Sequence, residues 1–357
     1  MEFKSHINNL IRLQTSQNRD LKNGVLLDRN ERADAYNNLD FKKELKSFSK
    51  NSFNATPDIS LLYKSIAKLH KVKTNNIYIT QGITECMSHI IFSFLKKNDE
   101  AIIMYPSYPM YDVLLKLHNI KYKLWKFTKN FNLEIRDLKK LINKKTKVIF
   151  LVNPNMPIEY EFSKKMKKEI YEICKKNNIL LVYDEAYHHF GSASEVQKTK
   201  KYKNLIVMKT FSKAWGLSGI RLGYMVANKK LSQYVSKCRT LVETNSLTYQ
   251  VALWALKHKI FKEHVKFVKE GSKYILKKFK VSKEKFHGGE KTNFILLKLP
   301  SQKLTTKLVT WLSKKKIYIR ANFPYPLKSY VRISLGSEKK LSTFYNAYIK
   351  WKKSNFI

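Results

Sequence analysis

The residues best suited to chemistry lie in one stretch, MKTFSKAWGLSGIRLGY (208–224), which holds three of the ten glycines of the chain. Lys213 follows an apolar run and precedes the glycines. We therefore expect a partly desolvated amine with a lowered pKa, free to act as a nucleophile in Schiff-base chemistry. Lys209, inside the apolar run, has a weaker claim. The alternative for each is a solvated surface lysine, the ordinary state of the 61 lysines in this chain.

Two hydroxyls and a guanidinium accompany Lys213 in the sequence: Thr210, Ser212 and Arg221. These groups suit a phosphate dianion, because hydroxyls and a fork-shaped cation donate several hydrogen bonds to it. A second segment, TQGITECMSHI (80–90), opens a predicted helix with a glycine and offers the free backbone N–H groups of its first turn to a phosphate. A lysine beside a phosphate site indicates an aldehyde cofactor that carries a phosphate, which is pyridoxal phosphate (PLP).

Such a cofactor also needs a carboxylate against its pyridinium nitrogen. Asp184, near the end of ILLVYDEA (179–186), is placed for this role, although an ordinary aspartate at a strand end is the plain alternative. Tyr108 offers a ring that can stack on the cofactor. Tyr187, or an asparagine of NPN (153–155), can reach the phenolic oxygen. Each signal is weak alone, but in this order, each at the end of a predicted strand, they are specific together.

The elements that must position these residues are short apolar runs separated by amphipathic helical patterns. The runs are EAIIMYP (100–106), KVIFLVNP (147–154), ILLVYDEA (179–186) and NLIVMKTF (204–211). This alternation predicts an α/β fold with a mainly parallel sheet and helices on both faces. Ligands of such sheets bind outside the carboxyl ends of the strands, which is where the candidate residues lie.

The length and the change of pattern after about residue 245 predict two domains. Residues 40–245 are expected to form a large PLP-binding domain. Residues 1–39 and 246–357 are expected to form a smaller α+β domain together with the N-terminal segment. Its expected elements are a long helical region over 246–280 and strands within 293–299, 317–323 and 330–336.

The composition bounds the class of protein. The net charge is +43, but only nine of the 70 basic residues are arginine, the residue that nucleic-acid surfaces use heavily, so we expect no nucleic-acid partner. The charge still favours anionic, for example phosphorylated, substrates. No apolar run is long enough to cross a bilayer, and the N-terminus has no signal-peptide pattern. Three distant cysteines indicate neither a disulfide framework nor a zinc site, so we expect a cytoplasmic protein without a metal.

With these residues in this order, the chain resembles the fold-type I PLP-dependent aminotransferases of class I and II, nearest the histidinol-phosphate aminotransferase-like branch. The resemblance runs from LLDRNER (26–32) to YVRISLG (330–336), and TFSKAWGLSGIRLGY is its most specific part. It implies an aspartate aminotransferase-like fold, PLP as the cofactor and a homodimer. It assigns cofactor-binding roles to Gly82, Ile83, Thr84, Tyr108, Asn155, Asp184, Tyr187, Thr210, Ser212, Lys213 and Arg221.

Among these residues the resemblance implies three catalytic ones. Lys213 matches the lysine that carries the cofactor, Asp184 the partner of the pyridinium, and Tyr187 the hydrogen-bond donor to the phenolate. The resemblance implies that Thr210, Ser212 and Arg221 hold the cofactor phosphate together with the backbone and side chains of residues 82–84.

The resemblance also implies substrate-binding arginines. Arg332 matches the arginine that pairs with the substrate α-carboxylate, and Arg320 matches one that binds a distal phosphate. Asn30 lies in the N-terminal segment that covers the site in the family. Arg32, in LDRNER (27–32), is expected near the entrance, where it either serves a phosphorylated substrate or is a surface residue.

Two departures from the family pattern indicate a specialised member rather than an enzyme of the histidine pathway. The family often reads NPNNPTG where this chain reads NPNMPIE, so Met156 replaces the asparagine directly before the second proline. Asn153 and Asn155 both remain candidates for the cofactor contact, and Asn155 is favoured. The family often has a tyrosine where this chain has Thr56, and that tyrosine reaches the cofactor phosphate of the partner subunit.

The sequence therefore predicts a homodimeric aminotransferase that takes an amino group from an amino acid, with glutamate as the expected donor, and gives it to a small phosphorylated carbonyl compound. The alternative on the same scaffold is a decarboxylase of a phosphorylated amino acid, of the phosphothreonine or phosphoserine type. A third hypothesis, from another class, is a basic nucleic-acid-binding protein on a PLP-enzyme scaffold. It predicts an added DNA-binding module, which the sequence does not show.

Overall fold

The computed structural model describes residues 4–8, 10, 19–36 and 51–355 of the chain. Its largest element is a seven-stranded sheet with the order β2-β8-β7-β6-β5-β3-β4. The strands are β2 (Ile77–Thr80), β3 (Glu100–Tyr105), β4 (Lys121–Lys126), β5 (Thr146–Val152), β6 (Leu180–Asp184), β7 (Leu205–Thr210) and β8 (Gly223–Val226). Neighbouring strands are parallel from β4 to β7, whereas β8 runs antiparallel to both β7 and β2. The expected mainly parallel α/β sheet is confirmed.

The four apolar runs identified in the sequence became β3, β5, β6 and β7, the strands with helices on both sides. The sequence analysis did not identify β2, β4 and β8. The reason is plainest for β4, KYKLWK, an edge strand whose first and last lysines are exposed, so it lacks the continuous apolar run of a buried parallel strand. The segments β2 and β8 are only four residues long.

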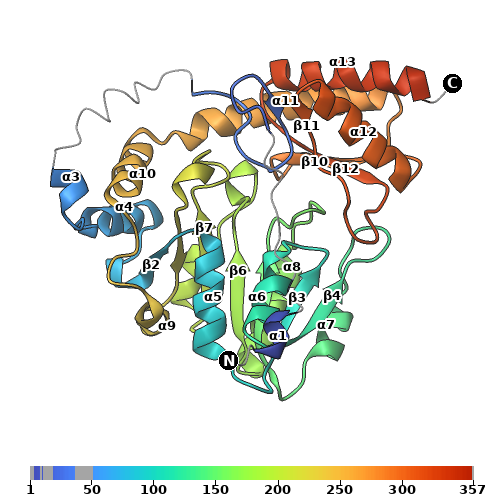
Figure 1. Cartoon of the computed structure of the whole chain (residues 1–357). Coiled ribbons are helices and arrows are strands. Elements are labelled where there is room, and N and C mark those ends of the chain that lie inside the picture. The colour runs from blue at the N-terminus through green and yellow to red at the C-terminus, as the bar shows by residue number, and fades with distance from the viewer. Residues whose placement is uncertain (1–3, 9, 11–18, 37–50, 356–357) are drawn as a thin grey trace.

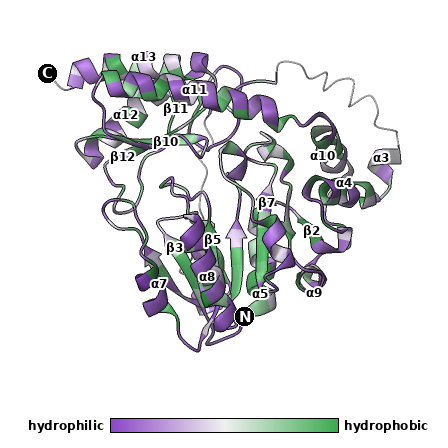
Figure 2. Ribbon diagram, turned by 180° about the vertical axis from the view of Figure 1, so that it is seen from behind, coloured by the Kyte–Doolittle hydropathy of each residue, from purple (hydrophilic) through white to green (hydrophobic). Residues whose placement is uncertain are grey.

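Helices cover both faces of this sheet, as Figures 1 and 2 show from opposite sides. They are α4 (Ser60–His70), α5 (Ile83–Phe94), α6 (Met110–Leu117), α7 (Ile135–Leu141), α8 (Lys164–Lys176), α9 (Lys229–Val235) and α10 (Ser246–His258). In Figure 2 the strands of the sheet are mostly green and the outer face of α8 is mostly purple. Helix α8 buries Ile170, Tyr171 and Cys174 and turns most of its lysines to solvent, as its amphipathic pattern predicted.

A smaller lobe sits on the carboxyl ends of the parallel strands (Figure 1). Its antiparallel sheet has the order β12-β10-β9, made of β9 (Phe286–Gly288), β10 (Phe294–Lys298) and β12 (Tyr330–Ser334). The helices α11 (Phe261–Val281), α12 (Gln302–Lys314) and α13 (Glu338–Asn355) accompany it. The N-terminal segment joins this lobe through β1 (Val25–Leu26), which pairs in parallel with β11 (Ile317–Tyr318). Among the described helices, none has the length and apolarity of a membrane span.

The expected helical region over 246–280 is two helices, because the chain turns at Lys259, which has a left-handed backbone. Helix α10 packs on α4, and its buried Val251 and Trp254 belong to the core of the large sheet. The packing therefore places α10 with the large lobe, although the boundary expected at residue 245 assigned it to the small one.

Candidate active site

Lys213 lies just beyond the carboxyl end of β7, between the two lobes. Its side chain is partly buried, and Nζ donates a hydrogen bond to the carbonyl oxygen of Arg29 at 3.1 Å. Loss of hydration, and to a smaller extent the nearby positive charge of Arg332, lower the pKa of the Lys213 amine to about 8. A larger share of this amine is therefore unprotonated near neutral pH than for an ordinary lysine.

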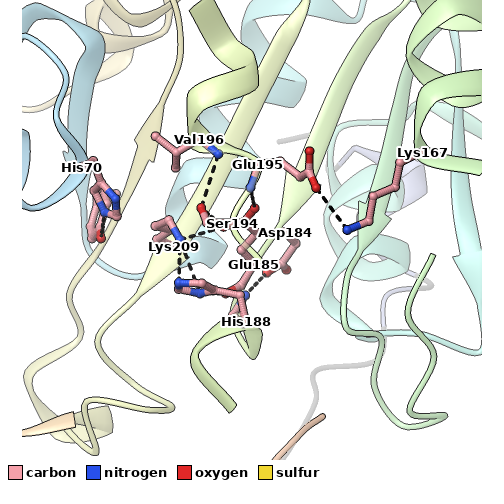
Figure 3. A network of polar contacts seen from close by, with 11 residues as sticks. His70, Lys167, Asp184, Glu185, His188, Ser194, Glu195, Val196 and Lys209 are labelled. Carbon is pink, nitrogen blue, oxygen red and sulfur yellow. Dashed lines mark hydrogen bonds and ion pairs between the residues drawn. The ribbon is translucent and has the colours of Figure 1, made fainter. Parts of the chain in front are cut away.

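Lys209, the rival lysine, points to the other side of the strand, into the core. Its side chain is 2% exposed, and Nζ lies 2.6 Å from Oε2 of Glu185 (Figure 3). Neighbouring residues of a strand face opposite sides, so Thr210 can face the site while Lys209 is buried behind it. An amine held by a carboxylate in the core is not available to a ligand, and the structure favours Lys213.

Asp184 closes β6 and is 3% exposed. Its carboxylate accepts two hydrogen bonds: Oδ1 from the backbone N–H of Ala186 at 3.0 Å, and Oδ2 from the hydroxyl of Tyr111 at 2.9 Å. Burial raises the pKa of Asp184 to about 6, and the two hydrogen bonds oppose this rise. A cation placed beside this carboxylate would favour its charged form.

Tyr111 is a site residue that the sequence analysis did not single out. It lies on α6, three residues after Tyr108, and its ring meets that of Tyr108 edge to face at 6.3 Å. The available signal was its closeness to Tyr108 in YPSYPMY, because Tyr108 lies just before the start of α6 and Tyr111 in its first turn.

The groups expected to bind a phosphate are brought together from two distant segments. Gly82 precedes α5 with a φ of 81°, and a Cβ atom there would lie 3.0 Å from Nη2 of Arg221. A Cβ atom on Gly223 would lie 2.7 Å from the carbonyl carbon of Gly82 and 2.8 Å from the nitrogen of Ile83. Both glycines are thus required for β8 and the Arg221 side chain to approach the start of α5.

Two hydroxyls complete this set. The Oγ1 atom of Thr210 accepts the N–H of Ser212 at 3.0 Å, and Oγ of Ser212 lies 3.5 Å from Nη1 of Arg221. On the α5 side, Oγ1 of Thr84 lies 3.4 Å from the hydroxyl of Tyr108. A guanidinium, hydroxyls and a helix N-terminus are the donors that a phosphate dianion prefers, so this arrangement fits a phosphorylated cofactor.

Tyr187 is buried behind Lys213, whose Nζ lies 6.0 Å from the centre of the Tyr187 ring. Its hydroxyl accepts a hydrogen bond from Nδ2 of Asn30 at 3.0 Å, and burial raises the pKa of Tyr187 to about 12. Asn30 has a left-handed backbone (φ 54°), held by the hydroxyl of Ser334 and by the side chain of Asn293. Asn30 therefore reaches the hydroxyl expected to face the cofactor.

Arg332 lies on β12 and is 7% exposed, between the rings of Phe294 and Phe323. Its Nη2 donates to the carbonyl oxygen of Asp28 at 2.8 Å, and Nη1 lies 3.2 Å from Sδ of Met156. Its Nε is buried and has no partner within the described residues. Burial lowers the pKa of Arg332 to about 10. A buried guanidinium with a free donor is prepared for an anion.

Arg320 is paired with Arg332 through the backbone, with N–H to O distances of 3.0 and 2.7 Å. Its side chain is exposed, and within the described part of the chain it has no hydrogen bond or ion pair. Arg332 and Arg320 thus present two cations from adjacent segments of the small lobe, one buried and one open to solvent.

Arg32 is not the surface residue that the sequence left as one alternative. Its side chain is 3% exposed, its Nη2 pairs with Glu263 at 2.8 Å, and its guanidinium stacks on Tyr36 at 4.0 Å. The Tyr36 hydroxyl in turn donates to the carbonyl oxygen of Trp215. These contacts fasten residues 28–36 over the turn that carries Lys213.

The asparagines of NPN are both buried. Asn155, the favoured candidate for cofactor contact, uses its amide within the protein: Nδ2 donates to the carbonyl oxygens of Pro106 and Ile158, and Oδ1 accepts from Ser107. Nδ2 of Asn153 has no partner within the described residues. Met156, not an asparagine, is the residue of this segment that contacts Arg332. Thr56 is exposed.

Comparisons with known proteins agree with this geometry. Residues 9–347 match the family model described as aminotransferase class I and II. The histidinol-phosphate aminotransferase of Thermoanaerobacter pseudethanolicus is 32% identical over 72% of each chain, and that of Methanocaldococcus jannaschii is 31% identical over 80% of this chain and 77% of its own.

Solved structures share the fold. The histidinol-phosphate aminotransferase of Sinorhizobium meliloti in complex with pyridoxal-5'-phosphate has a TM-score of 0.81 at 19% identity, covering 92% of this chain and 90% of that one. The L-threonine-O-3-phosphate decarboxylase of Porphyromonas gingivalis has a TM-score of 0.75 at 22% identity, covering 92% and 99%.

Proposed function

This chain belongs to the aminotransferases of class I and II, and from that premise we propose that it moves an amino group from glutamate to a small phosphorylated carbonyl compound. It is a PLP-dependent enzyme. The observation that carries the choice of substrates is Arg332, a buried arginine whose Nε has no partner in the described part of the chain. It lies near Lys213 and has the exposed Arg320 beside it.

The residues that would hold PLP come from several segments that are distant in the sequence. Its phosphate suits the start of α5 with Thr210, Ser212 and Arg221, and its ring suits the space between Tyr108 and Asp184. When bound, PLP supplies an electron sink for the pair of electrons left when the substrate α-proton departs.

Lys213 is the residue that would carry the cofactor covalently and, once displaced by the donor amine, move a proton at the substrate α-carbon. Its lowered pKa suits both tasks, because the amine must accept and return a proton near neutral pH. Asp184 would stay anionic beside a cationic ring nitrogen, and the hydroxyl of Tyr111 and the N–H of Ala186 hold its carboxylate in place. Tyr187, positioned by Asn30, would donate a hydrogen bond to the phenolic oxygen of PLP.

Arg332 would bind the α-carboxylate of the donor. Its aromatic neighbours exclude water, which strengthens a pair between guanidinium and carboxylate. The thioether of Met156 is only a weak acceptor, so it does not compete strongly for Nη1. Arg320 would bind the phosphate of the second substrate, in keeping with the relatives, which are histidinol-phosphate aminotransferases.

Decarboxylation of a phosphorylated amino acid remains the second candidate, because a decarboxylase of L-threonine-O-3-phosphate shares this fold. The same PLP and arginine sites would serve it, since the two reactions differ in which bond to the α-carbon is broken. The relatives of 30% identity or more named above are aminotransferases, which favours transamination.

We also infer a homodimer in the cytoplasm. Large apolar side chains are exposed on α4, α5, α9, α10 and the segment between α9 and α10, namely Leu61, Phe92, Tyr234, Leu247 and Leu241. An exposed apolar surface of this kind is typical of an interface between subunits.

One assay separates the two reactions. Purified holoenzyme is mixed with glutamate, and conversion to the amino form of the cofactor is followed by absorbance. In parallel, release of CO2 from phosphoserine and phosphothreonine is measured. Glutamate-dependent conversion without CO2 supports transamination, whereas CO2 release without conversion replaces it with the second candidate.

Arginine-to-lysine variants test the substrate sites, because lysine keeps the charge but loses the planar fork. Arg332→Lys should weaken use of glutamate strongly, and Arg320→Lys should mainly raise the KM of the phosphorylated substrate. Loss of one charge-assisted hydrogen bond is worth about 1.5–3 kcal/mol, or roughly 10–150-fold. Arg136→Lys, at an exposed position of α7, is the matched control. If all three variants behave alike, neither Arg332 nor Arg320 binds a substrate and the pocket lies elsewhere.

A further inference from the structure

A second group of charged residues lies in the core directly behind the cofactor site. We call Lys209, Glu185 and His188 the polar brace. Figure 3 shows the amine of Lys209 turned toward both His188 and Glu185. The ion pair between Lys209 and Glu185 is almost completely buried, with side chains 2% and 1% exposed. The reaction described above uses none of the three residues.

The contacts of the brace form a closed ring. Lys209 Nζ lies 2.6 Å from Oε2 of Glu185 and 3.0 Å from Nε2 of His188, and Nδ1 of His188 lies 3.0 Å from the carbonyl oxygen of Glu185. Burial and the charge of Lys209 hold the pKa of His188 well below its usual range. The imidazole of His188 is therefore neutral. These contacts assign its proton to Nδ1, which donates a hydrogen bond to the carbonyl oxygen of Glu185.

The carboxylate oxygens of Glu185 also accept hydrogen bonds from residues outside the polar brace. Its Oε2 accepts the hydroxyl of Ser194 at 2.7 Å, and its Oε1 accepts the backbone N–H of Glu195. Its own N–H donates to the carbonyl oxygen of Met208 on β7 at 3.0 Å. The carboxylate thus joins the end of β6, the turn after it and β7 at one point.

Each member of the brace is the chain neighbour of a cofactor-site residue. The pairs are Glu185 with Asp184, His188 with Tyr187, and Lys209 with Thr210. A peptide bond is planar and stiff, so fixing one residue of a pair restricts the place and direction of the other. The brace holds the end of β6, the turn of residues 187–190 and the end of β7 in one arrangement.

We propose that the polar brace is a positioning device for cofactor binding, which sets the relative places of the three site residues beside it. This inference rests on the assignment of those three residues to PLP. A buried ion pair is a poor source of stability, since hydrophobic side chains of the same volume often serve as well or better. The contribution of the polar brace is geometric. Hydrogen bonds among a lysine, a carboxylate and an imidazole are directional, so they fix the relative positions of three backbone segments. Apolar packing has no such directionality and fixes these positions less uniquely.

The test compares two buried lysines. Lys167 on α8 is 8% exposed and pairs with Glu195 at 3.0 Å, but its chain neighbours are not cofactor-site residues. Lys209→Met and Lys167→Met are prepared as holoenzymes beside the wild type. The dissociation constant for PLP, the absorbance spectrum of the bound cofactor, kcat and the melting temperature are measured for each.

We expect both variants to melt at a lower temperature than the wild type. Only Lys209→Met should also bind PLP more weakly, by at least roughly tenfold, which is the scale seen when the partners of a ligand-holding residue are removed. A fall in kcat on the order of 10²-fold should accompany it, as for a small misplacement of reacting groups. Lys209→Arg, which keeps the charge and the donors, should recover part of both.

A double variant separates position from stability. Lys209→Met/Glu185→Gln removes both charges, so it should regain much of the melting temperature lost by Lys209→Met alone, yet bind PLP no better. Recovery of PLP affinity and kcat together with stability would overturn the proposal, as would equal losses of affinity in Lys209→Met and Lys167→Met. Failure of the wild type to bind PLP would instead overturn the proposed function.

Discussion

At the residue scale, the chemistry depends on which lysine keeps a free amine. Lys209 and Lys213 are four positions apart in a chain rich in lysine, and both are desolvated. Burial lowers the pKa of Lys209, but the carboxylate of Glu185 opposes this and occupies the amine. Among the described residues, Lys213 has only a backbone carbonyl as its hydrogen-bond partner, and a second cation lies nearby. Its amine is the one that can be released.

The pH at which Lys213 becomes reactive follows from its lowered pKa of about 8. Only the unprotonated amine attacks an aldehyde, so capture of PLP by the cofactor-free protein should speed up as pH rises through about 8 and then level off. Stopped-flow absorbance measures the rate. In Lys213→Ala, borohydride reduction should leave no cofactor attached after dialysis. A rate that keeps rising to pH 10 would mean that an ordinary lysine reacts.

The carboxylate of Asp184 and the hydroxyl of Tyr111 should act together. Asp184→Asn should retain PLP but lose on the order of 10²-fold in kcat, because the charge acts in the chemical step. Tyr111→Phe removes a hydrogen bond that lowers the pKa of Asp184, so that pKa should rise. The carboxylate is then protonated at higher pH, and the acidic limb of the kcat profile should move to higher pH. An unmoved acidic limb in a folded Tyr111→Phe protein would contradict the role given to Tyr111.

At the element scale, the proposed phosphate site depends on the close approach of β8 to the start of α5. In Gly223→Ala the added methyl group would meet the backbone of Gly82 and Ile83 at less than van der Waals distance. Overpacking of this kind costs about 1–3 kcal/mol, so both the melting temperature and the affinity for PLP should fall. Gly219→Ala is the control, since no atom lies within 4 Å of the added Cβ there. Equal affinity for PLP in the two variants would rule out this packing argument.

Glu159 joins the two lobes close to the site. Its carboxylate accepts hydrogen bonds from the N–H groups of Gly289 and Glu290, both at 3.1 Å, and from the hydroxyl of Thr292 at 2.6 Å. Residues 289–292 connect β9 to β10, and β12 with Arg332 pairs with β10. The contact therefore sets where the substrate arginine stands relative to the large lobe.

In Glu159→Ala the loss of these three hydrogen bonds should loosen the small lobe and raise the KM of both substrates, with a smaller effect on PLP affinity. The expected rise is roughly tenfold, equivalent to about one net hydrogen bond. Steady-state kinetics measure it, and faster amide hydrogen exchange over residues 287–292 should accompany it. Glu161→Ala, which removes a 3.5 Å ion pair with Lys291, is the control. A Glu159→Ala protein with unchanged KM values would show that the lobes are held elsewhere.

At the scale of the whole molecule, a highly charged chain combines with an exposed apolar surface. Leu241 is 92% exposed and Phe92 is 71% exposed. The segment that carries Leu241 runs between α5, where Cys238 contacts Ser93, and α4, where Glu243 binds Tyr63. Leu241 and Phe92 therefore lie on elements of the large lobe that contact one another.

Light scattering after size exclusion should find a dimer for the wild type and a shift toward monomer for Leu241→Lys. The physical reason is that one more cation in each copy adds to the repulsion of two chains that each carry +43, while apolar contact area is lost. The shift should be larger at low salt, where charges are less screened. Val281→Lys, at the exposed end of α11, is the control. A wild type that is monomeric at assay concentrations would contradict the dimer.

The sequence by itself determined the parts of this protein that depend on local pattern. Continuous apolar runs identified four central strands, and the polar residues at their ends pointed to Asp184 and Lys213 as candidates. Both signals are local, because the pattern of a strand and the residue preferences of a turn extend over only about ten residues. The same logic missed β4, whose edge position leaves lysines on its exposed side. It also could not show that α10 packs on the core of the large sheet, because a helical pattern does not say which core the helix joins.

Only the tertiary structure decided what distant segments do to one another. It separated Lys213 from Lys209, because the burial of an amine depends on the carboxylate that faces it, and Glu185 is 24 residues away. It brought Tyr111 to Asp184 and Asp28 to Arg332, across 73 and 304 residues. It also turned Arg32 from a candidate surface residue into an internal ion pair. Such pairings follow from how whole lobes pack, and no local pattern carries that information.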